Sequence, residues 1–154
     1  MQEIHGPAAL AHYLAALATP GTLWLEEHPW LRQAAPELAK LGVETAFGSQ
    51  TWAPDADTVV TVALGAIPET GSVIMPGGGG PASWLPFRAR RQIVLVPPEK
   101  AGLSLSQALE AAAREETGLS TWLTGPSRTT DIEKVLVLGA QGPEQLDVVI
   151  YQPE

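Results

Sequence analysis

The 154-residue sequence contains no cysteine. This absence excludes disulfide bonds, thiol nucleophiles and an iron–sulfur cluster held by the chain's own thiolates. Histidine is scarce as well, because His5, His12 and His28 are the only three, and they do not have the spacing of a zinc site. The sequence therefore predicts neither a bound metal nor a cofactor.

Positive charge is also in short supply. Nine basic residues face seventeen acidic ones, which gives a net charge of −8 and a pI of about 4.8. Such a field repels a phosphate backbone, so nucleic acid is not expected as a partner. The one basic cluster, Arg88, Arg90 and Arg91, is consistent with a solvated turn or with an anion site.

Long apolar runs are missing too. The longest ones, such as "VVTVALGAI", are far shorter than the ~20 residues of a membrane helix. The amino terminus lacks the basic start and apolar core of a signal peptide. We therefore expect a cytoplasmic protein without a membrane span.

The pattern that is present is that of one α/β domain over residues 1–154. Apolar, β-branched segments alternate with helical ones, which predicts a layered domain with a largely parallel central sheet. The expected strands are 22–26, 43–47, 58–67, 72–75, 92–97, 120–124 and 146–151. The expected helices follow Pro7, follow His28 with a break or kink at Pro36, and follow a capping box at Ser104 through Thr117.

The segment "IPETGS" ends the expected strand 58–67 and contains a candidate catalytic residue, Glu69. A carboxylate beside a glycine turn can act as a base or as a nucleophile on an acyl group. Gly71 permits a tight turn, and Thr70 and Ser72 supply hydroxyl groups for a substrate. A hairpin turn whose polar side chains bond to the local backbone accounts for the same residues.

A run of four glycines at 77–80 follows the next strand. Glycines after a strand are typical of phosphate-binding loops, but the spacing matches neither a dinucleotide fingerprint nor a P-loop. A connecting loop explains the run equally well.

The late motif "TGPSRTTDIE", residues 124–133, combines turn, hydroxyl and charged residues. Thr130 and Glu133 match a capping box, and Asp131 suits the first turn of a helix, so a helix is expected to begin at Thr130.

The remaining side chains of the late motif, beside Gly125, are Ser127, Arg128 and Thr129. Backbone N–H groups and a bidentate arginine at this place could hold a carboxylate or phosphate.

The "ETGS" and "TGPSRTTDIEKVLVLGAQGPEQLDVVI" segments together resemble the LUD-domain family, in particular the lactate utilisation protein C (LutC/YkgG) type. The resemblance implies a three-layer α/β/α fold, Rossmann-like and similar to the NagB/RpiA/CoA-transferase group. It also implies a non-redox subunit that acts beside iron–sulfur partner proteins in oxidising L-lactate to pyruvate. The family resemblance and the late motif make Thr70, Gly71, Ser72, Gly125, Ser127, Arg128, Thr129, Asp131 and Glu133 candidate contacts of a small carboxylate or other anionic metabolite.

Two positions depart from the family pattern, because Gln141 and Asp147 stand where the family has histidines. Alternatives to the LutC-like role therefore stay open. One is a stand-alone acyl- or phospho-metabolite enzyme similar to CoA transferases, with Glu69 as the nucleophile or base. The other is a regulatory or structural domain without catalysis. A homo-oligomer is compatible with each.

Overall fold

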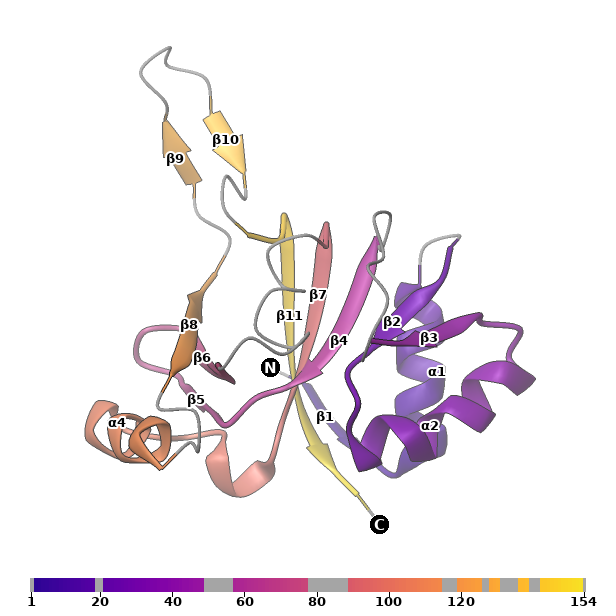
Figure 1. The fold of residues 1–154 in the computed structure, drawn as a ribbon, viewed down its shortest axis with the longest axis horizontal. Helices are drawn as coiled ribbons and strands as arrows, with labels where there is room; N and C mark the ends of the chain where they lie inside the picture. Colours follow the sequence, from indigo (N-terminus) through magenta and orange to yellow (C-terminus); the bar gives the residue numbers. More distant parts are fainter. Residues whose placement is uncertain are drawn as a thin grey trace.

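The centre of the molecule is a six-stranded parallel sheet with the strand order β1-β11-β7-β4-β2-β3 (Figure 1). The computed structural model describes residues 2–18, 21–48, 57–77, 89–114, 119–125, 128–130, 136–138 and 142–153. The strands of this sheet are β1 (Gln2–His5), β2 (Leu23–Leu25), β3 (Thr45–Phe47), β4 (Thr58–Val62), β7 (Arg91–Val96) and β11 (Gln145–Gln152). The predicted α/β class with a parallel central sheet is confirmed.

One face of this sheet is covered by α1 (Pro7–Leu17) and α2 (Pro29–Lys40). Strand side chains alternate between faces, so Ile93 and Leu95 of β7 pack against these helices. The helices bury Leu10, Leu14, Leu31 and Leu38 completely. Full burial of one such side chain is worth about 1.5–3 kcal/mol, so this layer is a major source of stability.

The other face of the sheet receives a small antiparallel sheet made of β5 (Gly65–Ile67), β6 (Ser72–Pro76) and β8 (Ser120–Thr124). Val73 and Met75 of β6 pack with Val94 and Val96 of β7. Ile74 faces the opposite way and joins a cluster with α4 (Leu105–Ala113). The third layer thus consists, in the described part of the chain, of a small sheet backed by α4 (Figure 1).

The segment 58–67 is not the single strand that its apolar character predicts. It is divided into β4 and β5, which belong to different sheets. The Ala63 N–H donates to the carbonyl of Leu95 in the large sheet, whereas the next N–H, of Leu64, donates to Ile74 in the small sheet. The chain therefore changes sheets between two consecutive residues. The predicted hairpin with 72–75 is confirmed, because β5 and β6 pair antiparallel.

The helices predicted after Pro7, His28 and Ser104 are present, with two differences. Helix α2 is one element from Pro29 to Lys40 with Pro36 inside it, so the helix does not break there. The capping box at Ser104 is formed, but α4 ends at Ala113 instead of Thr117.

In the late motif, Arg128–Thr130 form strand β9, which pairs antiparallel with β10 (Leu136–Leu138). Thr130 pairs with Leu136, so the expectation of a helix beginning at Thr130 is wrong. Strand pairing of Thr129 with Val137 fits the preference of β-branched residues for sheets, and this preference outweighs the local capping pattern.

Candidate functional site

Glu69 lies in the tight turn that connects β5 and β6, and its side chain is exposed. The turn is closed by two backbone hydrogen bonds, from Thr70 N–H to the Ile67 carbonyl (3.3 Å) and from Gly71 N–H to the Pro68 carbonyl (3.2 Å). Gly71 has a φ of 65°, a left-handed conformation that favours glycine. The turn thus holds the Glu69 carboxylate out in solvent at the end of the small sheet.

The small sheet brings the two predicted motifs together, because Ser72 of β6 pairs with Thr124 of β8. The Thr70 hydroxyl donates to the Ser72 hydroxyl (2.7 Å), and the hydroxyls of Ser72 and Thr124 are 2.8 Å apart. Ser72 is only 5% exposed. This hydroxyl chain fixes the start of the late motif directly beside the Glu69 turn.

The other predicted contacts are described only in part. Gly125 follows Thr124 with a φ of 57°, and the backbones of Arg128 and Thr129 lie in β9. Ser127, Asp131 and Glu133 lie outside the described residues, as do Gln141, Arg88 and the last three residues of the 77–80 glycine run.

A second group of polar residues, which the sequence did not predict, lies at the carboxyl end of the large sheet. From β2 the chain proceeds to β3 on one side, whereas from β4 it proceeds through the small sheet to β7 on the other side. In such sheets, ligands bind beyond the carboxyl ends of the strands at the point where the connections diverge. Here this point lies between β2 and β4.

Glu26, the residue directly after β2, occupies the point of divergence. Its backbone N–H donates to the Val60 carbonyl (2.9 Å), and its side-chain Oε2 accepts a hydrogen bond from the backbone N–H of Val62 (2.6 Å). Burial raises the pKa of the Glu26 carboxyl from 4.5 to about 7, although the bond from Val62 lowers it in part. Glu26 can therefore both hold and release a proton near neutral pH.

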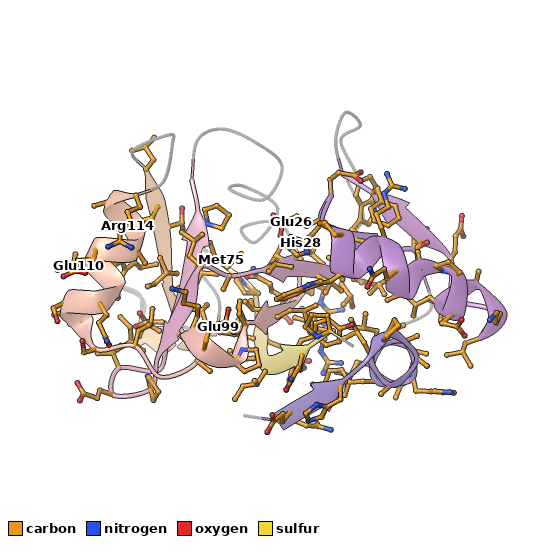
Figure 2. The ribbon with its side chains drawn as sticks, turned by 90° about the horizontal axis from the view of Figure 1, so that it is seen from below. Glu26, His28, Met75, Glu99, Glu110 and Arg114 are labelled. Carbon is orange, nitrogen blue, oxygen red and sulfur yellow. The ribbon has the colours of Figure 1, made fainter. Side chains whose placement is uncertain are left out.

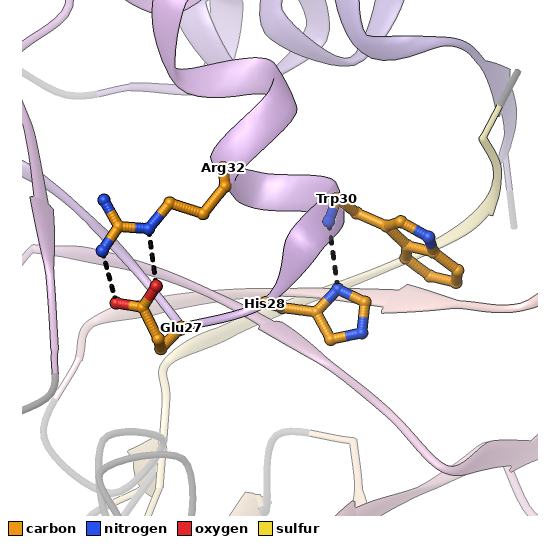
Figure 3. A network of polar contacts seen from close by, with 4 residues as sticks. All are labelled: Glu27, His28, Trp30 and Arg32. Atoms are coloured by element: carbon orange, nitrogen blue, oxygen red, sulfur yellow. Dashed lines mark hydrogen bonds and ion pairs between the residues drawn. The ribbon is translucent and has the colours of Figure 1, made fainter.

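His28 lies two residues further on, as the N-cap of α2. Its Nδ1 accepts a hydrogen bond from the Trp30 N–H (3.3 Å), so the proton of the neutral ring is on Nε2 (Figure 3). The Trp30 ring contacts the imidazole edge-on, with centroids 4.8 Å apart, and packs in the same way on Tyr151. Burial lowers the pKa of His28, which keeps the ring neutral at pH 7.

Glu26 and His28 line a cavity of about 330 Å³. Its walls are largely apolar, and the 3₁₀ helix Pro98–Lys100 contributes exposed charges at its rim. Figure 2 shows Glu26, His28 and Glu99 in the middle of the molecule, between α4 and α2. We call this cavity the switch-point cleft; its lining is Glu26, His28, Trp30, Val62, Ala63, Leu64, Pro76, Pro97, Glu99 and Lys100.

One signal for Glu26 was present in the sequence. An acidic residue directly follows the apolar strand "LWL" and precedes a helix that begins with proline. A carboxylate at the end of a parallel strand is a candidate ligand contact, but the same pattern also describes an ordinary polar loop. Only the strand order shows that this strand borders the point of divergence.

Arg90 and Arg91 of the basic cluster lie at the opposite, amino-terminal end of the sheet. Arg90 forms an exposed ion pair with Glu144 (3.3 Å), and Arg91 lies 3.4 Å from Asp147 while donating to the Leu17 carbonyl (3.1 Å). Both arginines are therefore paired within the chain. Asp147 thus has a structural partner in Arg91.

The described part of the chain lacks two further features. No set of three or more His, Asp or Glu side chains there is arranged to hold a metal ion. No helix there is long and apolar enough to cross a membrane.

Comparison with known proteins connects these features to a family. The LUD domain matches residues 50–151, which include β4 to β10 and most of β11. The chain belongs to the LUD-domain family. The match includes Glu69 and the whole late motif, the segments on which the resemblance was based.

Two relatives of this LUD-domain chain are named lactate utilization protein C. The protein from Deinococcus radiodurans is 36% identical over 102 residues, which cover 62% of this chain and 46% of that protein. The protein from Exiguobacterium sp. is 25% identical over 159 residues, which cover 97% of this chain and 64% of that protein. The chain thus spans about half to two thirds of the length of these relatives.

A solved structure supports the fold of this LUD-domain chain. The crystal structure of a DUF162 family protein from Deinococcus radiodurans superposes with a TM-score of 0.69 and 22% sequence identity. The superposition covers 98% of this chain and 88% of that one. Since the identity is low, this likeness concerns the arrangement of the elements.

Proposed function

We propose that the chain is a LutC-like, non-redox subunit of a complex that oxidises L-lactate to pyruvate. The observation that carries this proposal is the match of residues 50–151 to the LUD domain, together with two relatives named lactate utilization protein C. A chain without cysteine cannot hold a thiolate-ligated cluster, so the electrons would pass to iron–sulfur partner subunits.

The geometry of the small sheet supports a role for the two motifs in binding a small carboxylate. The hydroxyl chain from Thr70 through Ser72 to Thr124 holds the Glu69 turn beside the late motif. Arg128 would then supply the positive charge for the carboxylate, and Ser127 and Thr129 further donors. Gly71 and Gly125 would leave the backbone open to such a ligand, and Asp131 and Glu133 are further candidate contacts of it.

The exposed Glu69 carboxylate favours a second candidate function, a stand-alone enzyme that acts on acyl or phosphorylated metabolites. In that case Glu69 would be the nucleophile or base, and the late motif would hold the anionic end of the substrate.

The test compares lysates of the source organism with and without the chain. Removal of the chain should abolish L-lactate-dependent reduction of an artificial electron acceptor, and addition of the purified chain should restore it. The tagged chain should also retain an iron-containing, cysteine-rich protein from wild-type lysate. We expect Arg128→Ala to restore less than a tenth of the activity, which corresponds to the loss of more than about 1.4 kcal/mol of interaction.

Full lactate oxidation without the chain would contradict the proposal. Full restoration of activity by Arg128→Ala would contradict only the assignment of the late motif as the carboxylate site, and the proposed subunit role would stand. The second candidate predicts instead that Glu69→Gln abolishes turnover of the acyl or phosphorylated metabolite while the fold stays intact. Full turnover in that variant would rule it out.

A further inference from the structure

The switch-point cleft contains two hydrogen-bond donors on one short connection. Glu26 uses Oε2 for the Val62 N–H, so its other oxygen, Oε1, is available to a ligand when protonated. His28 uses Nδ1 for the Trp30 N–H, so its Nε2–H is available as well. The aromatic contacts of Trp30 with His28 and Tyr151 keep the imidazole in place.

The start of α2 offers no donor of its own to such a ligand. Pro29 has no N–H, the Trp30 N–H is taken by the His28 ring, and the Leu31 N–H donates to the His28 carbonyl. In the described part of the chain, the donors that this connection offers to a ligand are therefore the side chains of Glu26 and His28, and Lys100 adds a charged donor at the rim.

We propose that the switch-point cleft binds the carboxylate of a small organic acid, which accepts one hydrogen bond from a protonated Glu26 and one from Nε2 of His28. The cleft volume of about 330 Å³ is at the lower end of the usual range for small-molecule sites. Its apolar walls suit the carbon skeleton of the acid. The inference rests on the proposed function only for the choice of a carboxylate as ligand.

The bound carboxylate requires that Glu26 keep its proton. An O–H donor on a carboxylate makes a short, strong hydrogen bond, whereas two facing carboxylates repel each other. Since Glu26 has a pKa of about 7 in the empty cleft, binding above that pH takes up one proton. Binding below that pH takes up fewer protons, because the group is already protonated.

Among the described residues, three other titratable groups line the cleft with Glu26. His28 comes from the start of α2, and Glu99 and Lys100 come from the 3₁₀ helix. β4 and β6 contribute only apolar residues to the lining, namely Val62 and Pro76. Glu99 and Lys100 are both exposed, so solvent and salt screen their charges, whereas Glu26 is buried and has a raised pKa. We therefore expect Glu26 to dominate the pH dependence.

The cleft and the late-motif site are separate. Strand β6 begins at Ser72, which belongs to the hydroxyl chain, and ends at Pro76, which lines the cleft. The hydroxyl chain and the cleft therefore lie at opposite ends of one strand, and substitutions can distinguish the two sites.

The experiment measures binding of L-lactate, pyruvate and the neutral analogue lactamide to the purified chain by titration calorimetry. We expect pyruvate or L-lactate to bind, lactamide to bind at least tenfold more weakly, and the acid's affinity to fall about tenfold per pH unit above about pH 7. Titrations in buffers of different ionisation enthalpy should show uptake of about one proton per acid bound at about pH 8.

Glu26→Gln is the decisive variant, because an amide can donate to the ligand without titrating while its oxygen still accepts from Val62. The variant should bind the acid with an affinity that does not change between about pH 6 and pH 8. Glu27→Gln is the matched control. Glu27 is adjacent but lies outside the cleft lining and is paired with Arg32, so the pH dependence should stay as in the unmodified chain (Figure 3).

The proposal is overturned if no acid binds at about pH 6 or if lactamide binds as tightly as the acid. It is also overturned if the affinity of Glu26→Gln for the acid still falls with rising pH. Binding that is lost in Arg128→Ala and unaffected by Glu26→Gln and His28→Ala also overturns it, and places the carboxylate at the late motif instead. Lactate oxidation in lysate tests the complex independently, so failure of the cleft and failure of the proposed function give different results.

Discussion

At the scale of single residues, Glu26 links the stability of the fold to pH. Burial raises its pKa from 4.5 to about 7, so the folded chain holds a proton that the unfolded chain releases in this window. The folded state therefore loses stability as pH rises through this interval. Below about pH 4.5 both states are protonated and the penalty is absent; above about pH 7 it is complete.

Glu26→Gln removes this titration. Relative to the variant, the unmodified chain should lose about 3 kcal/mol of unfolding free energy between about pH 4.5 and pH 8. Urea denaturation of both proteins across this range measures the difference. A constant difference would show that Glu26 has an ordinary pKa.

The adjacent residue, Glu27, has the opposite effect on the pH dependence of stability. Its hydrogen bonds to Arg32 lower its pKa, so its contribution is present above the unfolded pKa and is lost as pH falls through the lower folded value. In Glu27→Gln the change should therefore appear only in acid. The two variants together separate burial from ion pairing.

Single residues also show which parts of the candidate sites can be predicted from the sequence alone. The "ETGS" and "TGPS" motifs were predicted, and the structure brings Thr70, Ser72 and Thr124 into one hydroxyl chain. Glu26 was missed, because its significance depends on which strands become neighbours in the sheet. Strand order is a long-range property that local residue patterns do not contain.

At the scale of secondary-structure elements, β6 and β8 approach each other closely at Gly77. The Gly77 N–H donates to the Leu119 carbonyl, and a Cβ on residue 77 would lie 2.5 Å from that same oxygen. The neighbour is backbone, so it cannot move aside easily. The first glycine of the 77–80 run is therefore required for packing, whatever the others do.

Gly77→Ala should cost about 2–4 kcal/mol, the sum of overpacking and a weakened hydrogen bond. Gly71→Ala is the matched comparison: its φ is 65°, but a Cβ there meets nothing within 4 Å. Only the backbone penalty of about 1–2 kcal/mol applies to it. Urea denaturation of both variants gives the ranking, and an equal cost would contradict the close approach at Gly77.

Most of the elements were predictable, and the misassigned ones have a common cause. The segment 58–67 is almost continuously apolar or β-branched because both β4 and β5 are buried, so nothing local marks the change of sheet at Ala63. At Thr130 the local capping pattern indicated a helix, but pairing with Leu136 placed the residue in a strand. Tertiary pairing decided both cases.

At the scale of the whole molecule, the net charge of −8 opposes the compact state. The exposed ion pairs Arg32–Glu27, Lys40–Glu37 and Arg90–Glu144 are weak, so screening them costs little. Salt should therefore stabilise the folded state, because screening the repulsion among the excess negative charges outweighs the loss of these ion pairs.

Raising NaCl to about 0.3 M at neutral pH should therefore shift the urea midpoint of unfolding upward. Unfolding is followed by tryptophan fluorescence. As a control, the fluorescence of the fully unfolded chain is measured at each salt concentration, so that an effect of salt on the signal itself is not taken for a shift of the midpoint. A lower midpoint would mean that the ion pairs outweigh the repulsion.

The parallel arrangement of β1 and β11 has a consequence for the order in which the protein forms during translation. Residue 2 pairs with residue 149, so β1 leaves the ribosome long before the strand beside which it belongs. At ordinary elongation rates this delay is roughly 10–30 s. During that time β1 lacks the strand with which it pairs, and α1 lacks part of the sheet on which it packs. This sheet is therefore completed only when β11 has been made.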